Sequence, residues 1–186
     1  MNDARNSAQA PGARQLRKLF AQQKQTDDGE HNANARTWFM KWITREKIKV
    51  GRVACPWLIK NFIDRNAEFV FLPHETDWAR INDGIVFDVP DCELGHHGED
   101  VSFNSILKKY KLTDPALVLL GEIVRAADSH PANPHPAGEG LRWVAGGFGA
   151  LGLSDREILE REFIVYDALY AECKRRVSRG LVAEVS

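Results

Sequence analysis

The spacing of apolar residues along the chain predicts a mainly helical domain with a small sheet near its start. Short apolar and aromatic runs are typical of strands, and three such runs occupy residues 38–43, 68–72 and 85–89. Longer segments with apolar residues three and four positions apart are typical of helices; they occupy residues 56–64, 102–109, 115–127, 141–151 and 155–176. Because the strands come early and the helices late, we expect one α+β domain with about three strands and five helices.

The change from polar to apolar sequence places this domain at residues 38–178. Residues 1–37 are rich in Asn, Gln, Asp and Arg, so we expect a flexible polar N-terminal tail, with an arm that docks on a partner subunit as the alternative. Residues 179–186 are expected to form a short C-terminal tail. The large aromatic side chains of Trp38 and Trp42 favour burial against another surface, which a second subunit would provide. A homodimer is therefore kept as a hypothesis.

Charge, hydropathy and cysteine content narrow the class of protein. The chain carries 25 basic and 26 acidic residues, a net charge of −1, which disfavours a dedicated DNA-binding protein. No segment approaches the roughly 20 apolar residues of a membrane span, and the first residues form no secretory signal. The 3 cysteines include no CxxC pair, which favours a reducing compartment. We therefore expect a soluble cytoplasmic protein.

The densest group of polar side chains follows the third predicted strand. Seven candidate metal ligands fall within residues 88–99: Asp88, Asp91, Cys92, Glu93, His96, His97 and Glu99. Glycines let such a loop turn sharply, so Glu93 and His96 are expected to face one cavity. Neighbouring side chains of an extended segment point in opposite directions, so only one of the two histidines is expected to bind. A solvated turn and an anion site without metal are the alternatives.

Asp128 is the third predicted metal ligand. It ends the predicted helix 115–127, where a carboxylate opposes the helix dipole, so we expect a compensating cation, either Arg125 or a bound metal. Together with Glu93 and His96 it gives a mixed carboxylate and imidazole set, which suits a divalent transition metal such as Zn, Mn or Fe.

Two further residues precede the predicted helix 56–64. A thiol near a helix N-terminus has a lowered pKa and acts as ligand or nucleophile, which makes Cys55 a candidate catalytic residue, with a small buried hydrophobe as the alternative. Arg52 is a candidate anion-binding residue, because free backbone N–H groups lie beside it. Glu99 is the second candidate catalytic residue, and Arg125 the second candidate substrate-binding residue.

Several blocks of the sequence resemble the C-terminal domain of the chromate-resistance ChrB family. They are KWITRE, RVACPWLIKNFID, AEFVFLP, FDVPDCELGHHGE, IVRAAD and VYDALYAECKR, in this order over residues 41–176. The resemblance carries over these polar positions: Arg52, Cys55, Asp64, Asp88, Glu93, His96, Glu99, Arg125, Asp128 and Asp167. It implies a part in chromate resistance, in which some members look like regulators of a chromate-efflux operon. This chain departs from longer members in its short N-terminal tail, which disfavours DNA binding.

Three hypotheses about function follow. The first is a metal-dependent enzyme that acts on a small anionic molecule, because three protein ligands leave coordination positions open. The second is a sensor or accessory protein in chromate resistance, in which Arg52 and Arg125 hold an oxyanion such as chromate without catalysis. The third is a scaffold whose polar cluster only stabilises the fold.

Overall fold

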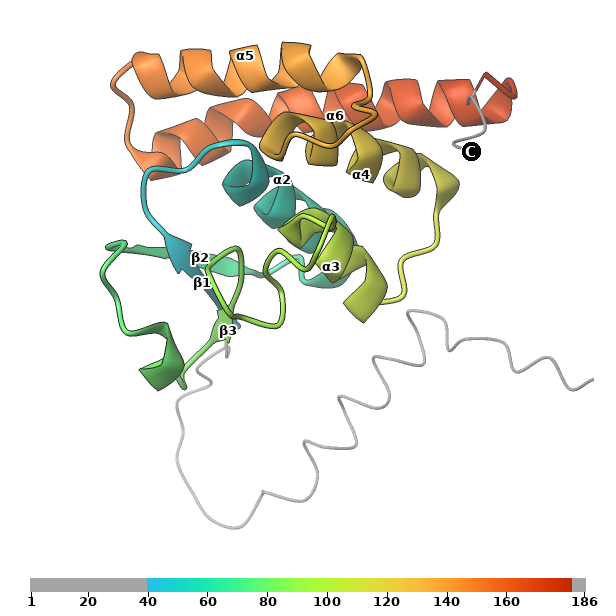
Figure 1. The fold of residues 1–186 in the computed structure, drawn as a ribbon. Helices are drawn as coiled ribbons and strands as arrows, with labels where there is room; N and C mark the ends of the chain where they lie inside the picture. Colours follow the sequence, from blue (N-terminus) through green and yellow to red (C-terminus); the bar gives the residue numbers. More distant parts are fainter. Residues whose placement is uncertain (1–39, 182–186) are drawn as a thin grey trace, which may run out of the picture. The chain divides into compact units, whose positions relative to one another are not determined.

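The computed structural model describes residues 40–181, in which three strands come before most of the helices (Figure 1). The strands are β1 (Lys41–Arg45), β2 (Glu68–Leu72) and β3 (Ile85–Val86). The α-helices are α2 (Val50–Leu58), α3 (Ser102–Lys109), α4 (Pro115–Asp128), α5 (Ala137–Ala150) and α6 (Asp155–Ser178). The predicted α+β class is confirmed. The expected N-terminal tail and residues 182–186 lie outside the described part of the chain.

The sheet is parallel and has β1 at its centre, in the order β2-β1-β3. The connection from β1 to β2 runs through α2 and a π-helical turn, η1 (Ile59–Ile63), since parallel neighbours need a crossover. A 3-10 turn, η2 (Trp78–Arg80), precedes β3. β3 is shorter than predicted, because Asp88 has a φ of 52° and this left-handed backbone cannot continue a strand.

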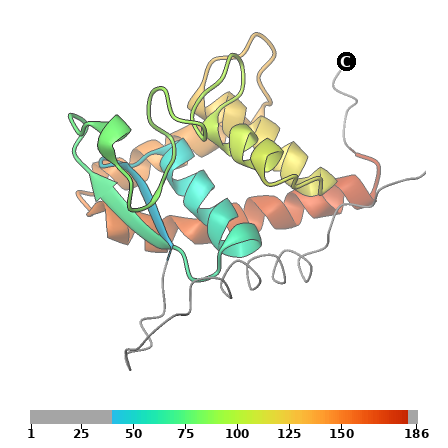
Figure 2. The same ribbon diagram turned by 90° about the horizontal axis from the view of Figure 1, so that it is seen from below.

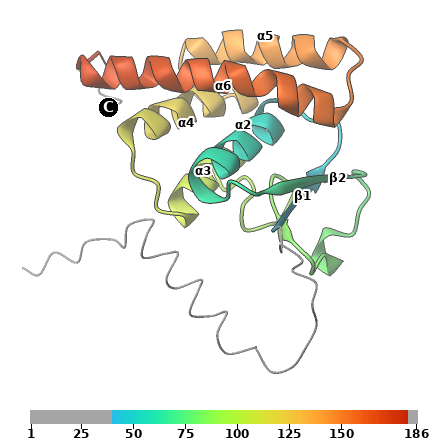
Figure 3. The same cartoon turned by 180° about the vertical axis from the view of Figure 1, so that it is seen from behind.

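Helix α2 forms the middle of the structure. It lies between the sheet and a layer in which α4, α5 and α6 pack on one another (Figures 1 and 3). Every residue of α2 except Arg52 is buried. Seen from below, α6 passes along the far side of α2 (Figure 2). The Tyr166 hydroxyl donates to the carbonyl of Val50 at 3.0 Å, and Trp57 Nε1 donates to Asp167 Oδ1 at 2.8 Å.

The segment before α2 is hydrogen-bonded to the first turn of α6, which comes more than 100 residues later in the sequence. The Asp155 carboxylate, in the first turn of α6, accepts hydrogen bonds from the backbone N–H groups of Lys47 at 2.9 Å and Ile48 at 3.0 Å. Lys47 has a φ of 59°, which turns the chain sharply between β1 and α2. The N-terminus of α2 is therefore positioned by α6 as well as by its own sequence.

Trp42 is part of the domain core. Its side chain is 1% exposed, it packs edge-on against Phe87, and its Nε1 donates to Asp64 Oδ2 at 3.2 Å. Burial within the domain thus accounts for this tryptophan without a second subunit. Trp38 lies outside the described residues, and the homodimer stays a prediction. Among residues 40–181, no helix combines the length and the apolar character needed to cross a membrane.

Glu162 of α6 is a carboxylate without a polar partner. The residue is 0% exposed, and neither carboxylate oxygen has a hydrogen-bond partner. Burial raises the pKa of Glu162 from 4.5 to about 7, because the charged form loses its hydration. Between these two values the folded state keeps a proton that the unfolded chain has released. The free energy of unfolding therefore falls as the pH rises from about 4.5 to about 7.

We expect Glu162→Gln to raise the free energy of unfolding at pH 8 by about 1–3 kcal/mol, because it removes a buried charge. The gain should shrink at pH 4.5, where the wild-type carboxyl is protonated. Urea unfolding at both pH values measures the effect. Glu160→Gln, an exposed residue of the same helix, is the matched control. Equal gains in both variants, or a gain that does not depend on pH, would contradict this assignment.

Candidate metal site

Two carboxylates and one imidazole, from the loop after β3 and from α4, converge at the end of α4. They are Asp88, two residues after β3, His96 from the following loop, and Asp128, the last residue of α4. One ligand atom of each lies within 4.8 Å of the others. His96 Nε2 is 3.4 Å from Asp88 Oδ1 and 3.4 Å from Asp128 Oδ2. The structure thus brings together two of the three predicted ligands, His96 and Asp128, with Asp88, one of the seven candidates of the same loop.

Asp88 is fixed by its backbone and by two neighbouring side chains. Its left-handed backbone is unfavourable by about 1–2 kcal/mol for a residue with a side chain, and such strain persists where the surroundings hold it. The Ser102 hydroxyl donates to Asp88 Oδ1 at 2.6 Å, and Arg52 Nη1 lies 3.7 Å from Oδ2. Asp88 is only 5% exposed, so these contacts fix the orientation of its carboxylate in the absence of a ligand.

Asp128 is oriented by α2. The backbone N–H of Gly51 donates to Asp128 Oδ1 at 3.3 Å. The expected compensation at the α4 C-terminus comes from Arg142, whose guanidinium donates to three carbonyls there at 2.6–3.0 Å: those of Ala126, Ala127 and Ser129. Arg125 instead forms an ion pair with Glu122 at 2.5 Å. The second carboxylate oxygen of Asp128, Oδ2, faces His96, whose Nε2 lies 3.4 Å away.

His96 is the exposed member of the group, with 48% of its side chain open to solvent. Hydrogen bonds to Asp128 and then to Asp88 raise the pKa of His96 from 6.5 to about 10, because both carboxylates favour the imidazolium. With no metal bound, His96 therefore carries a proton at neutral pH. The stabilisation from this pairing is present below pH 6.5 and is lost as the pH rises towards about 10.

The spacing of the three side chains fits a metal ion. Metal–ligand bonds of about 2.1 Å in a tetrahedral arrangement put neighbouring ligand atoms about 3.4 Å apart. The two His96–carboxylate distances, both 3.4 Å, match this spacing. Solvent reaches the group on the side of His96, so a bound ion would keep open positions.

Glu93, the other predicted ligand, lies outside this group. Its side chain is 69% exposed and forms an ion pair with Lys109 of α3. The loop turns between Glu93 and His96, so their spacing of three residues does not bring the two side chains to the same place. His97 also points elsewhere, with its Nε2 2.9 Å from the carbonyl of Glu93, consistent with only one histidine facing the site.

Cys55 is fully buried inside α2. The helix begins at Val50, six residues before the predicted start, so Cys55 lies in its second turn and not beside free N–H groups. Burial raises the pKa of the Cys55 thiol well above its usual value, and Asp88 and Asp128 add to this effect. The expected lowering of this pKa is therefore reversed, and the thiol stays protonated at neutral pH.

Three predicted residues remain. Arg125 and Glu99 lie near each other, and Arg52 lies against Asp88. Arg125 Nη1 lies 3.7 Å from Glu99 Oε2, and 90% of the Glu99 side chain is exposed. Arg52 is 11% exposed and lies against Asp88. Ser102 is a partner of Asp88 that was not predicted, since a serine at the start of a helix usually serves as its N-cap. It is instead the first residue of α3.

Gly51 is required by the close approach of the two carboxylates. A Cβ atom on this residue would lie 2.6 Å from Asp128 Oδ2 and 3.1 Å from Asp88 Oδ2. No signal in the sequence marks this glycine, because the contact joins α2 to residues far along the chain.

We expect Gly51→Ala to lower the free energy of unfolding by about 1–3 kcal/mol, because the added methyl group overlaps both carboxylates. Gly147→Ala is the matched control, since a Cβ on this exposed helical glycine meets no atom within 4 Å, and it should be stabilising by about 0.5–1 kcal/mol. Thermal and urea unfolding measure both. A Gly51→Ala protein as stable as the Gly147→Ala protein would contradict the described packing.

We also expect Asp128→Asn to lower the pKa of His96 from about 10 towards its ordinary 6.5, because the substitution removes one of the two charges that favour the imidazolium. Titration of the metal-free protein by NMR measures this pKa directly. Asp91→Asn is the control: Asp91 is exposed in the same loop and has a φ of 59°, which asparagine tolerates. A His96 pKa that is the same in both variants would exclude the described contact.

Comparison with known proteins agrees with the resemblance seen in the sequence. The family model described as "ChrB, C-terminal domain" matches residues 42–173. Protein ChrB of Cupriavidus metallidurans is 32% identical over 131 residues, which cover 70% of this chain and 40% of that protein. The chain thus spans about two fifths of the length of this curated relative. No solved structure matches. The chain belongs to the chromate-resistance ChrB family, whose C-terminal domain it contains.

Proposed function

We propose that Asp88, His96 and Asp128 bind one divalent transition metal ion, and that the chain is a metal-dependent enzyme acting on a small anionic molecule. The observation that supports it is the convergence of three ligand atoms within 4.8 Å, two from the loop after β3 and one from the end of α4. The proposal keeps His96 and Asp128 from the sequence analysis and takes Asp88 in place of Glu93.

The surroundings of these residues favour a binding role over a simple surface cluster. The Ser102 hydroxyl and the Gly51 N–H hold the two carboxylates, and partners of this kind orient metal ligands in known sites. Two carboxylates and one imidazole suit Zn, Mn or Fe(II). A bound ion of this kind supplies Lewis-acid activation of a water or substrate oxygen.

Arg52 is the residue best placed to hold an anion beside this ion. It is mostly buried, lies 3.7 Å from Asp88, and its Nε is buried without a hydrogen-bond partner. A guanidinium suits planar and tetrahedral oxyanions, because it presents several donors in a fixed geometry. Glu99 remains the candidate acid–base residue, since its exposed carboxylate faces the solvent near Arg125. Cys55 has no part in the proposal, because its thiol is buried and protonated.

A sensor or accessory protein in chromate resistance is the second candidate. Without metal, His96 is protonated and stands near Arg52 through their shared partner Asp88. The half-exposed His96 and the largely buried Arg52 would meet an oxyanion such as chromate from two sides of Asp88, and membership of the ChrB family favours such a ligand. In this case the site binds without turnover.

We expect the purified protein to contain, or to take up, close to one Zn, Mn or Fe ion per chain. His96→Ala removes a ligand and Asp88→Asn removes the negative charge of another, so each should weaken metal binding by about 10- to 100-fold. Elemental analysis and calorimetric titration measure both. His97→Ala is the matched control, as this neighbouring imidazole lies on the Glu93 carbonyl, and it should bind metal like the wild type. Equal metal binding in all these proteins, or none in any, would refute the metal site.

A second measurement separates the two candidate functions. The enzyme is supported if the metal-loaded protein turns over small anionic esters and a chelator abolishes this activity. The sensor is supported if the metal-free protein binds chromate, and if Arg52→Met removes this binding while the circular dichroism spectrum stays unchanged.

A further inference from the structure

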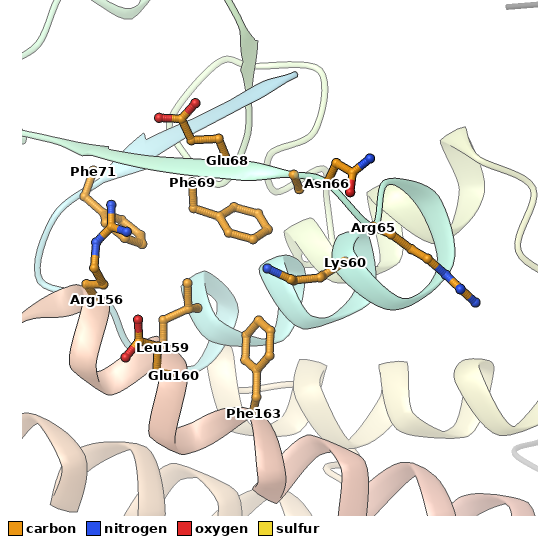
Figure 4. A pocket seen from close by; sticks show the side chains of 11 residues that line it. Lys60, Arg65, Asn66, Glu68, Phe69, Phe71, Arg156, Leu159, Glu160 and Phe163 are labelled. Atoms are coloured by element: carbon orange, nitrogen blue, oxygen red, sulfur yellow. The ribbon is translucent and has the colours of Figure 1, made fainter. Parts of the chain in front are cut away.

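A cavity separate from the candidate metal site lies between β2, η1 and α6 (Figure 4). Its volume is about 700 Å³, within the range of about 300–1,000 Å³ that is usual for small-molecule sites. None of its lining residues belongs to the group of Asp88, His96 and Asp128. The cavity therefore offers a binding place that the proposed function does not use.

The walls of this cavity are mainly aromatic and aliphatic. Phe69 and Phe71 are two residues apart on β2, so their rings leave the same face of the strand. Leu159 and Phe163 are four residues apart on α6, so they lie on one face of that helix. Phe69 and Leu159 are buried, whereas Phe71 and Phe163 are half-buried. The two half-buried rings leave apolar surface open to a ligand.

Cationic side chains stand at this apolar surface without counter-ions. Lys60 of η1 is directed into the cavity, and Arg156 of α6 lies beside Phe71 (Figure 4). Within residues 40–181, no ion pair involves either of them. The Glu68 carboxylate points to the opposite side of β2 from the rings (Figure 4), as the alternation of a strand requires. The second acidic lining residue is Glu160, four residues after Arg156 on the same face of α6, so the lining carries three cations, Lys60, Arg65 and Arg156, against two carboxylates.

We propose that this cavity binds a small amphipathic anion, whose flat apolar body lies among the rings of Phe69, Phe71 and Phe163 and whose carboxylate or sulfonate is held by Lys60 and Arg156. Apolar walls with a few well-placed charges are the usual composition of such sites. Lys60 and Arg156 are exposed, so solvent screens their attraction for an anionic group, and contact with the rings supplies the rest of the affinity.

The test uses the full chain and 8-anilinonaphthalene-1-sulfonate, which has a flat aromatic body and one sulfonate and becomes fluorescent in apolar surroundings. We expect one site per chain, and amide NMR shifts that cluster on β2, η1 and the first half of α6. Lys60→Met and Arg156→Met should each weaken binding about 5- to 10-fold. Both residues are exposed, so these substitutions should leave the fold intact.

Lys111→Met is the matched control, because this exposed lysine lies outside the cavity and forms no ion pair with the other residues that the structure describes. It should bind the probe like the wild type. The uncharged analogue N-phenyl-1-naphthylamine should bind the wild type and Lys60→Met equally. The proposal is overturned by absence of probe binding, by equal affinity in Lys60→Met and Lys111→Met, or by NMR shifts confined to other surfaces. The test uses no variant of Asp88, His96 or Asp128. A negative result here would therefore leave the metal-site proposal unaffected, and loss of the metal site would leave this proposal unaffected.

Discussion

The arrangement of the domain depends on how the first turn of α2 is held. Val50 accepts a hydrogen bond from Tyr166 of α6, and the next residue, Gly51, donates one to Asp128 of α4. Because Gly51 has no side chain, two carboxylates approach its backbone closely. The same turn carries Arg52, the one residue of α2 that is not buried. A single buried turn thus joins the helical layer, the loop after β3 and the polar group that we propose as the functional site.

Much of the architecture was accessible from the sequence, because helix and strand periodicity are local properties. Helix α2 shows where this reasoning failed. A proline is most often tolerated in the first turn, so Pro56 indicated a helix start, although Val50, Val53 and Ala54 already have helical spacing. In the structure the buried helix includes Pro56, and the π-helical turn η1 follows it directly. Burial among neighbouring elements outweighed the local preference of proline.

The candidate site was predictable only in part, for a similar reason. His96 and Asp128 stood out because of residue type and position at a loop and a helix end. Asp88 was one of seven candidate ligands but also fell within the predicted strand 85–89, and the contacts with Ser102 and Arg52 that hold its side chain are not visible in any local pattern. Glu93 has a suitable spacing from His96, but Lys109 attracts its side chain to the far side of the loop.

The hydrogen bonds from Lys47 and Ile48 to Asp155 join residues more than 100 positions apart, and they have a consequence for biosynthesis. A ribosome completes β1, α2 and the histidine loop long before the first turn of α6 leaves the exit tunnel. Contacts between distant parts of a chain are slow to form, because the intervening loop must be closed first. The nascent chain therefore exposes the start of α2 without this partner until the first turn of α6 has left the ribosome, and the site beside it is formed on a helix that is not yet held in place.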